Sequence, residues 1–472
     1  MERASNVLWA RREFGRAELG DTRRLTRLIR VGATLAGSPA GRVTEAFRSS
    51  AEREGAYRLL ENDAVDSSEI AKSIRRATAN RCFGEEIVFL PLDETTLSLC
   101  DRVDRRGLGI INKAVGARGL HVMSAIAVKQ DRTPIGICGQ QYWARRKPVG
   151  RGPDEYDPRK VEEKETQHWL DVMEQAQIAL DAEAPQTRRW FQLDRGGDAW
   201  PILRKAVTDG DWLTVRAQHS RRLMTHKGGR RRDYLWGWLA SQEPQGSYVL
   251  PVPAGKGRTA RHACMHLQFS AVTLEITDKK RPKQKFGLSL WAVRVVEVGT
   301  TPRGEKPINW TLLTTFPVHG REDAIQVVDG YTSRWRVEEF HKTWKSGACR
   351  IEDTQLQARD HIERFAVISA SVAMRIQRLT HLARTTPDEP ASIEFSRAEI
   401  EATILLREPK GIPRNATPTV GEMIRWIADL GGFMGPAPKN KNASRQPGAI
   451  VIRRGLERID PVATLLQRGV KL

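Results

Sequence analysis

The sequence predicts a mixed α/β fold in which a strand-rich middle is flanked by helical segments at both ends. Three observations indicate this. Apolar and basic residues recur with a helical period near the start of the chain, short apolar runs typical of strands follow from about residue 85, and helical periodicity returns from about residue 360. With 472 residues and 40% hydrophobic content, the chain is long enough for about three domains.

The first 72 residues or so read as a small helical module. Asp21 is a plausible N-cap, and the segment that follows it separates apolar from basic residues. One face carries Leu25, Leu28, Ile29 and Ala36, and the opposite face carries Arg23, Arg27 and Arg30. A second helical segment at 52–62 has the same mixture of apolar and basic residues and contains Arg58. An ordinary solvated arginine face is the alternative, but the overall charge favours contact with a DNA backbone.

The next part of the chain reads as three strands, a long amphipathic helix and a fourth strand. These segments are 86–96, 119–128, 134–143, 162–182 and 189–198. That order begins a ribonuclease-H-like fold, in which the first and fourth strands lie side by side. Asp93 and Asp194 end those two strands, 101 positions apart (194 − 93), and should therefore meet at one edge of the sheet.

Residues 200 to about 320 do not continue the helix–strand pattern, and we read them as a β-rich insertion. Further strand-like runs lie at 212–220, 263–276 and 288–298, separated by basic loops at 227–232 and 279–285. The remainder is mainly helical, at 361–379, 397–406 and 419–430, with an exposed loop at 436–448. The predicted domains are a helical domain at 1–72, a ribonuclease-H-like domain with the β-rich insertion at 73–375 and a helical domain at 376–472.

The formal net charge of +20 indicates a polyanionic partner. A merely basic protein is the alternative. The charged start of the chain does not resemble a signal peptide, and no apolar run approaches the length of about 20 residues that spans a bilayer. The partner is therefore expected to be nucleic acid rather than a membrane. Five scattered cysteines without a C-x-x-C pair suit a reducing compartment, so a cytoplasmic protein is expected.

One alternating cluster raises the question of a metal site. His262, Cys264 and His266 would share one face of a strand. Ligation of a metal there is open, although the many Arg and Lys residues near the run would repel a cation.

The most informative segment is YTSRWRVEEFHKTWKSG at 331–347. If it is helical, Tyr331, Arg334, Glu338 and Lys345 fall within an arc of about 60°. That face presents one carboxylate beside two cations and a phenol, which suits a site that holds a metal and grips phosphates. A surface helix with an incidental Arg334–Glu338 pair is the alternative.

Asp93, Asp194 and Glu338 together supply what phosphoryl transfer on DNA requires. Carboxylate oxygens bind hard Mg²⁺ or Mn²⁺, and a pair of such ions about 3.5–4 Å apart can activate a water or a 3′-hydroxyl and stabilise the leaving oxygen. Histidine and cysteine are not needed.

Five blocks of the chain resemble the insertion-sequence DDE transposases of the IS-four group, particularly the Tn-five type. The blocks are LGDTRR (19–24), EGAYRLLEN (54–62), LDETTLSL (92–99), LDRGGD (193–198) and the Y-R-E-K signature at 331–347. The resemblance runs through nearly the whole length. It implies that Asp93, Asp194 and Glu338 are the catalytic metal ligands for Mg²⁺, which Mn²⁺ can replace.

The resemblance also implies DNA contacts. Tyr331, Arg334 and Lys345 would hold phosphates near the cleaved end, with Lys342 as a further contact. Trp310 takes the place of a tryptophan that stacks on a flipped base, although an ordinary core tryptophan is the alternative. Arg216, with Arg221, resembles basic positions of the inserted domain that touch end DNA.

By the same resemblance, the protein is a synaptic homodimer that acts on double-stranded transposon ends and target DNA, associated with the bacterial nucleoid. The resemblance assigns DNA binding to residues 1–72, catalysis to residues 73–375 and dimerisation to residues 376–472. The expected steps are 3′-strand nicking, hairpin formation, hairpin resolution and strand transfer. One departure is visible, because the family's D-R-E-A-D reads Asp194-Arg195-Gly196-Gly197-Asp198 here. A catalytically decayed DNA-binding regulator of transposition therefore remains an alternative, as does a metal-dependent nuclease without strand transfer.

Overall fold

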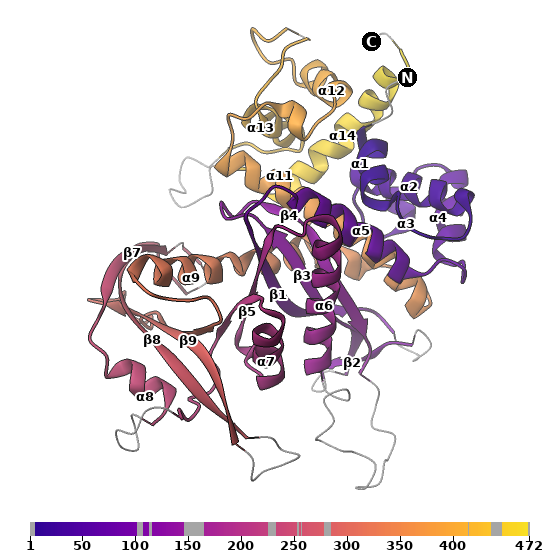
Figure 1. Cartoon of the computed structure of the whole chain (residues 1–472). Helices are drawn as coiled ribbons and strands as arrows, with labels where there is room; N and C mark the ends of the chain where they lie inside the picture. Colours follow the sequence, from indigo (N-terminus) through magenta and orange to yellow (C-terminus); the bar gives the residue numbers. More distant parts are fainter. Residues whose placement is uncertain are drawn as a thin grey trace.

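The computed structural model shows helices at both ends of the chain and a sheet between them, as expected for a mixed α/β fold (Figure 1). It describes residues 5–101, 107–112, 116–145, 165–224, 233–252, 254–255, 257–277, 285–413, 415–435 and 446–470. The basic loop at 227–232, nearly all of the loop at 279–285 and most of the loop at 436–448 lie outside these residues. No helix in the described ranges is long and apolar enough to cross a membrane.

The chain begins with five helices. These are α1 (Ser5–Phe14), α2 (Thr22–Gly37), α3 (Val43–Ala46), α4 (Ser50–Leu60) and α5 (Ser67–Cys82). Asp21 caps α2 as predicted, since its side chain accepts a hydrogen bond from the Arg23 N–H at 2.7 Å. Leu28 and Ile29 are buried while Arg23 is exposed, so the amphipathic interpretation is confirmed. Helix α5 runs through residue 72, where the sequence suggested a domain boundary.

Ten strands form one sheet within the described part of the chain. They are β1 (Ile87–Ser98), β2 (Gly109–Asn112), β3 (Ala117–Val128), β4 (Pro134–Trp143), β5 (Arg188–Leu193), β6 (Trp212–Arg216), β7 (Gly246–Val252), β8 (Arg261–Thr277), β9 (Lys285–Val298) and β10 (Asn309–Thr314). The strand order is β2-β3-β1-β5-β6-β10-β9-β8-β7, with β4 paired to β3. Strands β1 and β5 pair in parallel, which confirms the predicted neighbours.

Two apolar clusters cover opposite faces of the central strands. Phe89 and Trp190 belong to one cluster, whereas Leu90 and Phe191 belong to the other. This alternation follows from the two-residue repeat of a strand that is buried on both faces. Helices α6 (Thr166–Glu183) and α7 (Trp200–Asp209) cover the second face. Helices α9 (Arg321–Ser333) and α10 (Trp335–Lys345) cover the first, which is also the face of Asp93.

The segment 200–320 differs from the prediction at its start. Helix α7 and strand β6 continue the alternation of helix and parallel strand, because β6 pairs in parallel with β5. The antiparallel strands β7, β8, β9 and β10, together with α8 (Leu235–Ala240), follow only after β6. Helix α7 was missed because it is only 10 residues long and its buried apolar stripe consists of just Ile202, Leu203 and Ala206.

The chain ends in helices that pack beside the N-terminal ones (Figure 1). They are α11 (Arg359–Thr385), α12 (Arg397–Arg407), α13 (Val420–Leu430) and α14 (Ala449–Gln467), of which the sequence predicted the first three. Short 3₁₀ turns lie at η2 (Arg195–Gly197), η3 (Ile351–Asp353) and η4 (Ala391–Ile393). Helix α11 is buried along most of its length and contacts α2, α5, β4 and α10, so it joins the terminal helices to the sheet.

Candidate active site

Asp93 and Asp194 lie at the same edge of the sheet. The parallel register pairs Leu92 with Leu193, so each aspartate is the next residue along its strand. Asp194 directly follows β5 and caps the turn η2, where its Oδ1 accepts a hydrogen bond from the Gly196 N–H at 2.7 Å. The expectation that Asp93 ends its strand is wrong, because β1 continues to Ser98 in its pairing with β3. The expected proximity of the two aspartates is nevertheless present, since both directly follow the last pair of the β1–β5 ladder.

Glu338 reaches this edge from helix α10, which packs against β1 and β3. The connection is made through Arg334. Its Nη1 lies 3.1 Å from Asp93 Oδ2, and its Nη2 lies 2.5 Å from Glu338 Oε1. One guanidinium thus joins a strand carboxylate and a helix carboxylate that are 245 positions apart in the chain (338 − 93). The Arg334–Glu338 pair is not an incidental pair on a surface helix, since the Arg334 side chain is only 15% exposed.

Burial raises the pKa of Asp93 to about 7. The nearby Arg334 guanidinium lowers this pKa, while the charges of Asp194 and Glu338 raise it further. The charges of Asp194 and Glu338 therefore both act on Asp93, although the three carboxylates come from three separate elements. Carboxylates crowded in this way are stabilised in their charged form by additional positive charge.

Lys345 lies on the same side of the site and is held by two partners. Its Nζ donates a hydrogen bond to Thr95 Oγ1 at 3.2 Å and lies 3.7 Å from Glu352 Oε1. Glu352 Oε1 also accepts a hydrogen bond from the Ser98 N–H at 2.8 Å. Thr95 shares the strand face of Asp93 and could have been found from the two-residue repeat. Glu352 was not predicted from the sequence, because only the tertiary fold brings η3 to the end of β1.

Tyr331 and Trp310 form a second group beside the first. Their ring centroids are 5.5 Å apart in an edge-to-face arrangement, Tyr331 is buried and Trp310 is half-buried. Lys342 is exposed, and no ion pair joins it to the carboxylates among the described residues. Of the predicted helix face, Arg334, Glu338 and Lys345 come together with the strand residues, while Tyr331 packs against Trp310.

A cavity of about 460 Å³ opens at the strand ends. It is lined by Asp93, Glu94, Thr95, Thr96, Trp169, Asp194 and Gly196. Trp169 comes from α6 and was not predicted, because an aromatic residue on an amphipathic helix is usually part of the core. The cavity gives the two aspartates access from outside the sheet.

The donor atoms at this edge suit a hard divalent cation. Asp93, Asp194 and Glu338 offer carboxylate oxygens, which Mg²⁺ and Mn²⁺ prefer. Across the described ranges, however, no three His, Cys, Asp or Glu side chains are gathered closely enough to hold a metal ion. The charge at Asp93 and Glu338 is balanced instead by Arg334. The residues fit such an ion in chemistry and location, with Arg334 as its competitor.

The glycines at positions 196 and 197 are accounted for by close packing. A Cβ at Gly196 would lie 3.0 Å from Asp194 Oδ1 and 3.3 Å from the Trp169 ring. A Cβ at Gly197 would lie 2.5 Å from Leu193 Cδ2. The Asp194 carboxylate is oriented by the backbone of Gly196, so this contact does not depend on an acidic side chain at position 196.

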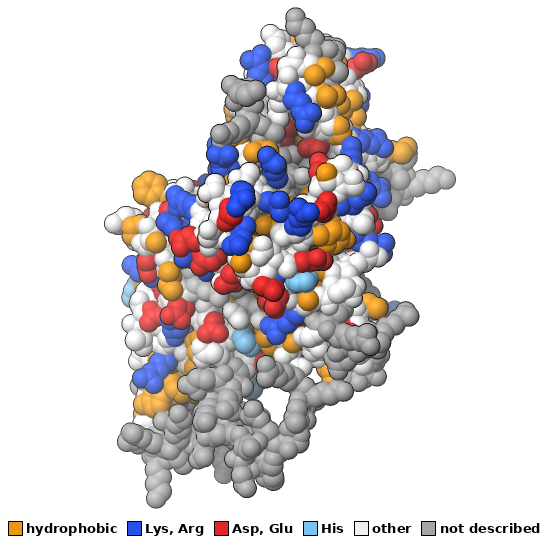
Figure 2. All heavy atoms as spheres, turned by 90° about the vertical axis from the view of Figure 1, so that its right-hand side faces the viewer, with side chains coloured by type: hydrophobic (Ala, Val, Ile, Leu, Met, Phe, Trp, Pro, Cys, Tyr) orange, Lys and Arg blue, Asp and Glu red, His pale blue; other side chains and the backbone are white. Residues whose placement is uncertain are grey.

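The remaining predicted DNA contacts lie on two parts of the molecule, three on the N-terminal helices and Arg216 on β6, where the parallel register pairs Val215 with Leu193 and so places Arg216 beside Asp194. Arg23 on α2 and Arg58 on α4 are exposed and Arg27 is half-buried. Lys and Arg side chains gather over the upper part of the face that includes these N-terminal helices (Figure 2). Arg216, at the end of β6, is half-buried, and its Nη2 donates to the Asn309 carbonyl at 3.3 Å. Arg221 instead pairs with buried Asp198, at 2.5 Å, so its guanidinium is engaged within the protein.

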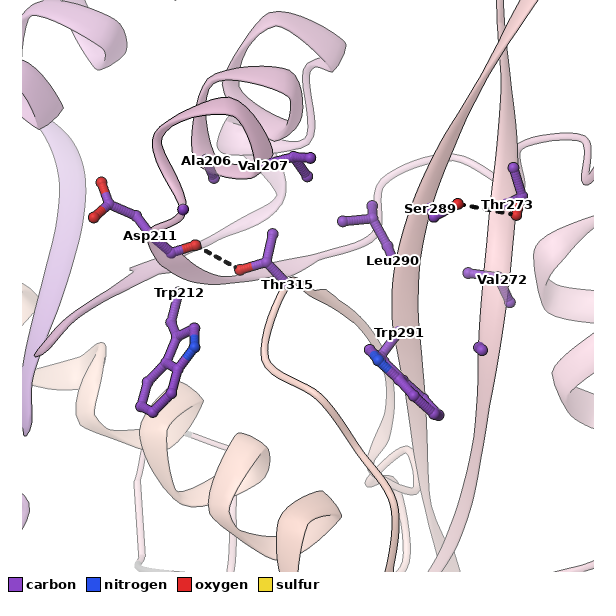
Figure 3. A pocket seen from close by; sticks show the side chains of 12 residues that line it. Ala206, Val207, Asp211, Trp212, Val272, Thr273, Ser289, Leu290, Trp291 and Thr315 are labelled. Atoms are coloured by element: carbon purple, nitrogen blue, oxygen red, sulfur yellow. Dashed lines mark hydrogen bonds between the residues drawn. The ribbon is translucent and has the colours of Figure 1, made fainter.

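Two other features do not belong to this site. His262, Cys264 and His266 do share one face of β8, with His262 and Cys264 exposed, but they are not gathered closely enough to form a metal site. A separate cavity of about 500 Å³ lies between α7 and strands β8 and β9 (Figure 3). Its walls include Val207, Leu290 and Thr315, and none of the predicted site residues lines it.

Three protein-family models match the chain. They are Transposase DNA-binding at residues 7–65, Transposase DDE domain at residues 219–375 and Transposase Tn5 dimerisation domain at residues 371–465. The DDE match includes Glu338 and begins after Asp93 and Asp194. The three matches follow one another in the order predicted for DNA binding, catalysis and dimerisation. The chain therefore belongs to the Tn5-like DDE transposases.

Proposed function

We propose that this transposase uses Asp93, Asp194 and Glu338 as the ligands of catalytic divalent metal ions and cuts and joins transposon DNA. The observation that carries the proposal is the meeting of the three carboxylates at one sheet edge, two of them bridged by Arg334. DNA binding and homodimer formation accompany this activity, in agreement with the matches to the DNA-binding and dimerisation families.

The metal ions, Mg²⁺ or in its place Mn²⁺, would supply charge stabilisation to the attacking and leaving oxygens. The protein residues supply positioning. Arg334 pairs with Asp93 and Lys345 binds Thr95 two residues further along β1, and both cations would grip the phosphates that flank the scissile bond. Tyr331 and Lys342 would extend that contact along the backbone.

The proposed reaction is a series of phosphoryl transfers that need no covalent protein–DNA intermediate. In the first step a water oxygen bonds to phosphorus, the 3′ oxygen leaves and a free 3′-hydroxyl results. That hydroxyl then attacks the opposite strand, so one phosphodiester replaces another and a hairpin forms. Water opens the hairpin, and the freed 3′-hydroxyl finally attacks target DNA. Trp310 would receive a base that leaves the stack when the hairpin bends.

The experiment uses the full-length protein and a supercoiled plasmid that carries the DNA flanking its gene on both sides. With Mg²⁺ or Mn²⁺, we expect an excised fragment with hairpin ends. Asp93→Ala and Glu338→Gln should abolish excision. Glu339→Gln is the matched control, since Glu339 is the next residue of α10 and pairs with Arg336 at 2.6 Å instead of with Arg334.

The other outcomes separate the remaining functions. Retarded DNA bands without cleavage, identical for wild type and Asp93→Ala, would identify a decayed DNA-binding regulator. Cleavage without joining would identify a nuclease that lacks strand transfer. Loss of excision in Glu339→Gln as well as Glu338→Gln would show that the assay reports damage to α10 rather than loss of a metal ligand.

A further inference from the structure

Arg334 makes two ion pairs that a catalytic metal ion would disrupt. Its guanidinium reaches Asp93 on β1 and Glu338 on α10, at 3.1 Å and 2.5 Å. The side chain is mostly buried, so water screens these contacts weakly. We infer that Arg334 keeps the metal site closed until DNA arrives, and that DNA phosphate and metal ion therefore bind cooperatively. The inference rests on the proposed function, because it requires Asp93 and Glu338 to be metal ligands.

The guanidinium and a divalent cation compete for the same oxygens. Arg334 uses one oxygen of each carboxylate, and a cation placed between the same two groups would lie against a positive charge. The described residues contain no group of three ligands gathered for a metal, which agrees with an arrangement closed by the arginine. Metal entry therefore requires Arg334 to release at least one carboxylate.

Lys345 cannot take the place of Arg334 without losing its own contacts. Its Nζ is bound to Thr95 and lies 3.7 Å from Glu352 Oε1. Arg334 is thus the cation that directly bridges the two carboxylates among the residues described. Removing it would leave Asp93 and Glu338 with uncompensated negative charge, which a divalent ion can neutralise.

A DNA phosphate offers Arg334 an alternative partner. The planar guanidinium binds a phosphate through two parallel hydrogen bonds, as it binds a carboxylate. Arg334 can therefore exchange a carboxylate for a phosphate and keep its hydrogen bonds. Once the arginine has moved to a phosphate, Asp93 and Glu338 are free for metal. Coupling of this kind is reciprocal, so bound metal must equally favour DNA. The protein without DNA would then hold metal weakly.

The test measures metal binding rather than activity. Full-length protein without DNA is titrated with Mn²⁺, and the free ion is followed by its electron paramagnetic resonance signal. Arg334→Gln should bind Mn²⁺ about tenfold more tightly than wild type, within the usual range of coupling between two sites. Arg334→Lys should fall between them, because an ammonium cannot bridge two carboxylates as a fork does. Arg336→Gln is the matched control, since Arg336 pairs with Glu339, and it should bind as wild type does.

A second titration adds duplex DNA from the regions that flank the gene. Wild type should then bind Mn²⁺ more tightly, whereas Arg334→Gln should gain little. Equal or weaker Mn²⁺ binding by both Arg334 variants, each with a wild-type melting curve, would overturn the inference and leave the proposed metal site standing. If Asp93→Asn does not reduce Mn²⁺ binding in wild type or in the Arg334→Gln background, the proposed metal site itself fails and the inference fails with it.

Discussion

At the scale of single residues, Asp93 is the group whose environment differs most clearly from water. It follows a fully buried strand segment and faces two other carboxylates, with Arg334 as its compensating charge. A carboxylate in such a position lowers the stability of the fold when no cation compensates its charge, and it can serve a functional site when a cation is present. The same residue therefore links stability, pH and metal binding.

The pH dependence of stability should reveal this environment. Because the pKa of Asp93 is raised from its ordinary value to about 7, the folded state favours the protonated form. The stabilisation of the folded state by protonated Asp93 is therefore fully present below about pH 4, and it is lost as the pH rises through 7. In EDTA, Asp93→Asn should remove this loss and stabilise the protein at pH 8 by roughly 1–3 kcal/mol.

Thermal melts between pH 5 and 8.5 measure the effect, with Glu339→Gln as the control that keeps the wild-type slope. Addition of Mn²⁺ should reverse the ranking, because the wild type binds the ion and Asp93→Asn has lost a ligand. The prediction would be contradicted if the difference in melting temperature between wild type and Asp93→Asn stayed the same at every pH.

At the scale of elements, the junction of α9 and α10 determines where the Y-R-E-K residues point. The two helices meet at Arg334, which keeps right-handed helical angles (φ −53°, ψ −32°) and so continues the helix face. The Ser333 hydroxyl donates to the Gly330 carbonyl at 2.6 Å within this turn. Helix α9 also approaches β5 closely at Gly330, where a Cβ would lie 2.8 Å from Gln192 Nε2.

Gly330→Ala should therefore push α9 away from the sheet. The added methyl would also lie 3.0 Å from the buried Phe89 ring, so neither neighbour has free space to move. We expect a loss of roughly 1–3 kcal/mol in unfolding free energy, measured by urea denaturation, together with reduced DNA cleavage because Tyr331 and Arg334 follow Gly330.

Gln192→Ala should partly rescue Gly330→Ala by making room. The amide of Gln192 is fully buried and neither of its polar atoms has a hydrogen-bond partner, so its removal costs no such bond. Gly55→Ala on α4 is the control, because no atom lies within 4 Å of its added Cβ, and it should leave stability unchanged or slightly higher. A double variant no more stable than Gly330→Ala alone would contradict the packing argument.

At the scale of the whole molecule, buried polar contacts tie the N-terminal helix to the C-terminal half. Asn6 donates to Asp460 Oδ1 at 2.8 Å and accepts from Arg375 at 2.5 Å. Glu13, which is buried, pairs with Arg81 and accepts from the Ser371 hydroxyl at 2.9 Å. These contacts join segments that the family matches assign to DNA binding and to dimerisation.

Asn6→Ala should be destabilising because it removes the hydrogen bond donated to half-buried Asp460 and the one accepted from buried Arg375, which then keeps its ion pair with Glu399 at 3.4 Å. Burial already raises the pKa of Asp460, and the Asn6 amide lowers it, so the carboxylate loses a stabilising donor. We expect the unfolding free energy of the full-length chain to fall by roughly 1–3 kcal/mol in urea. Asn62→Ala is a control with a smaller loss, since its side chain accepts only the local Ala64 N–H, at 2.9 Å. Equal losses in the two variants would show that the long-range contacts contribute nothing beyond a local cap.

The sequence by itself determined the elements that rely on local pattern. The Asp21 cap, the alternation of β1 and β3, and the helix face of Arg334 and Glu338 follow from neighbours a few residues apart, so periodicity predicts them. Family membership could also be predicted from local sequence, because the blocks that carry the resemblance are short and contiguous. The family matches confirm this prediction.

Only the tertiary structure decided how these elements meet. The bridge from Asp93 through Arg334 to Glu338, the anchoring of Lys345 by Glu352, and the extension of the core sheet by β6 all join residues distant in sequence. Their geometry depends on helix packing and strand register, which no local pattern encodes. Sequence could therefore point to three candidate carboxylates, whereas the Arg334 bridge between two of them became visible only in the folded chain.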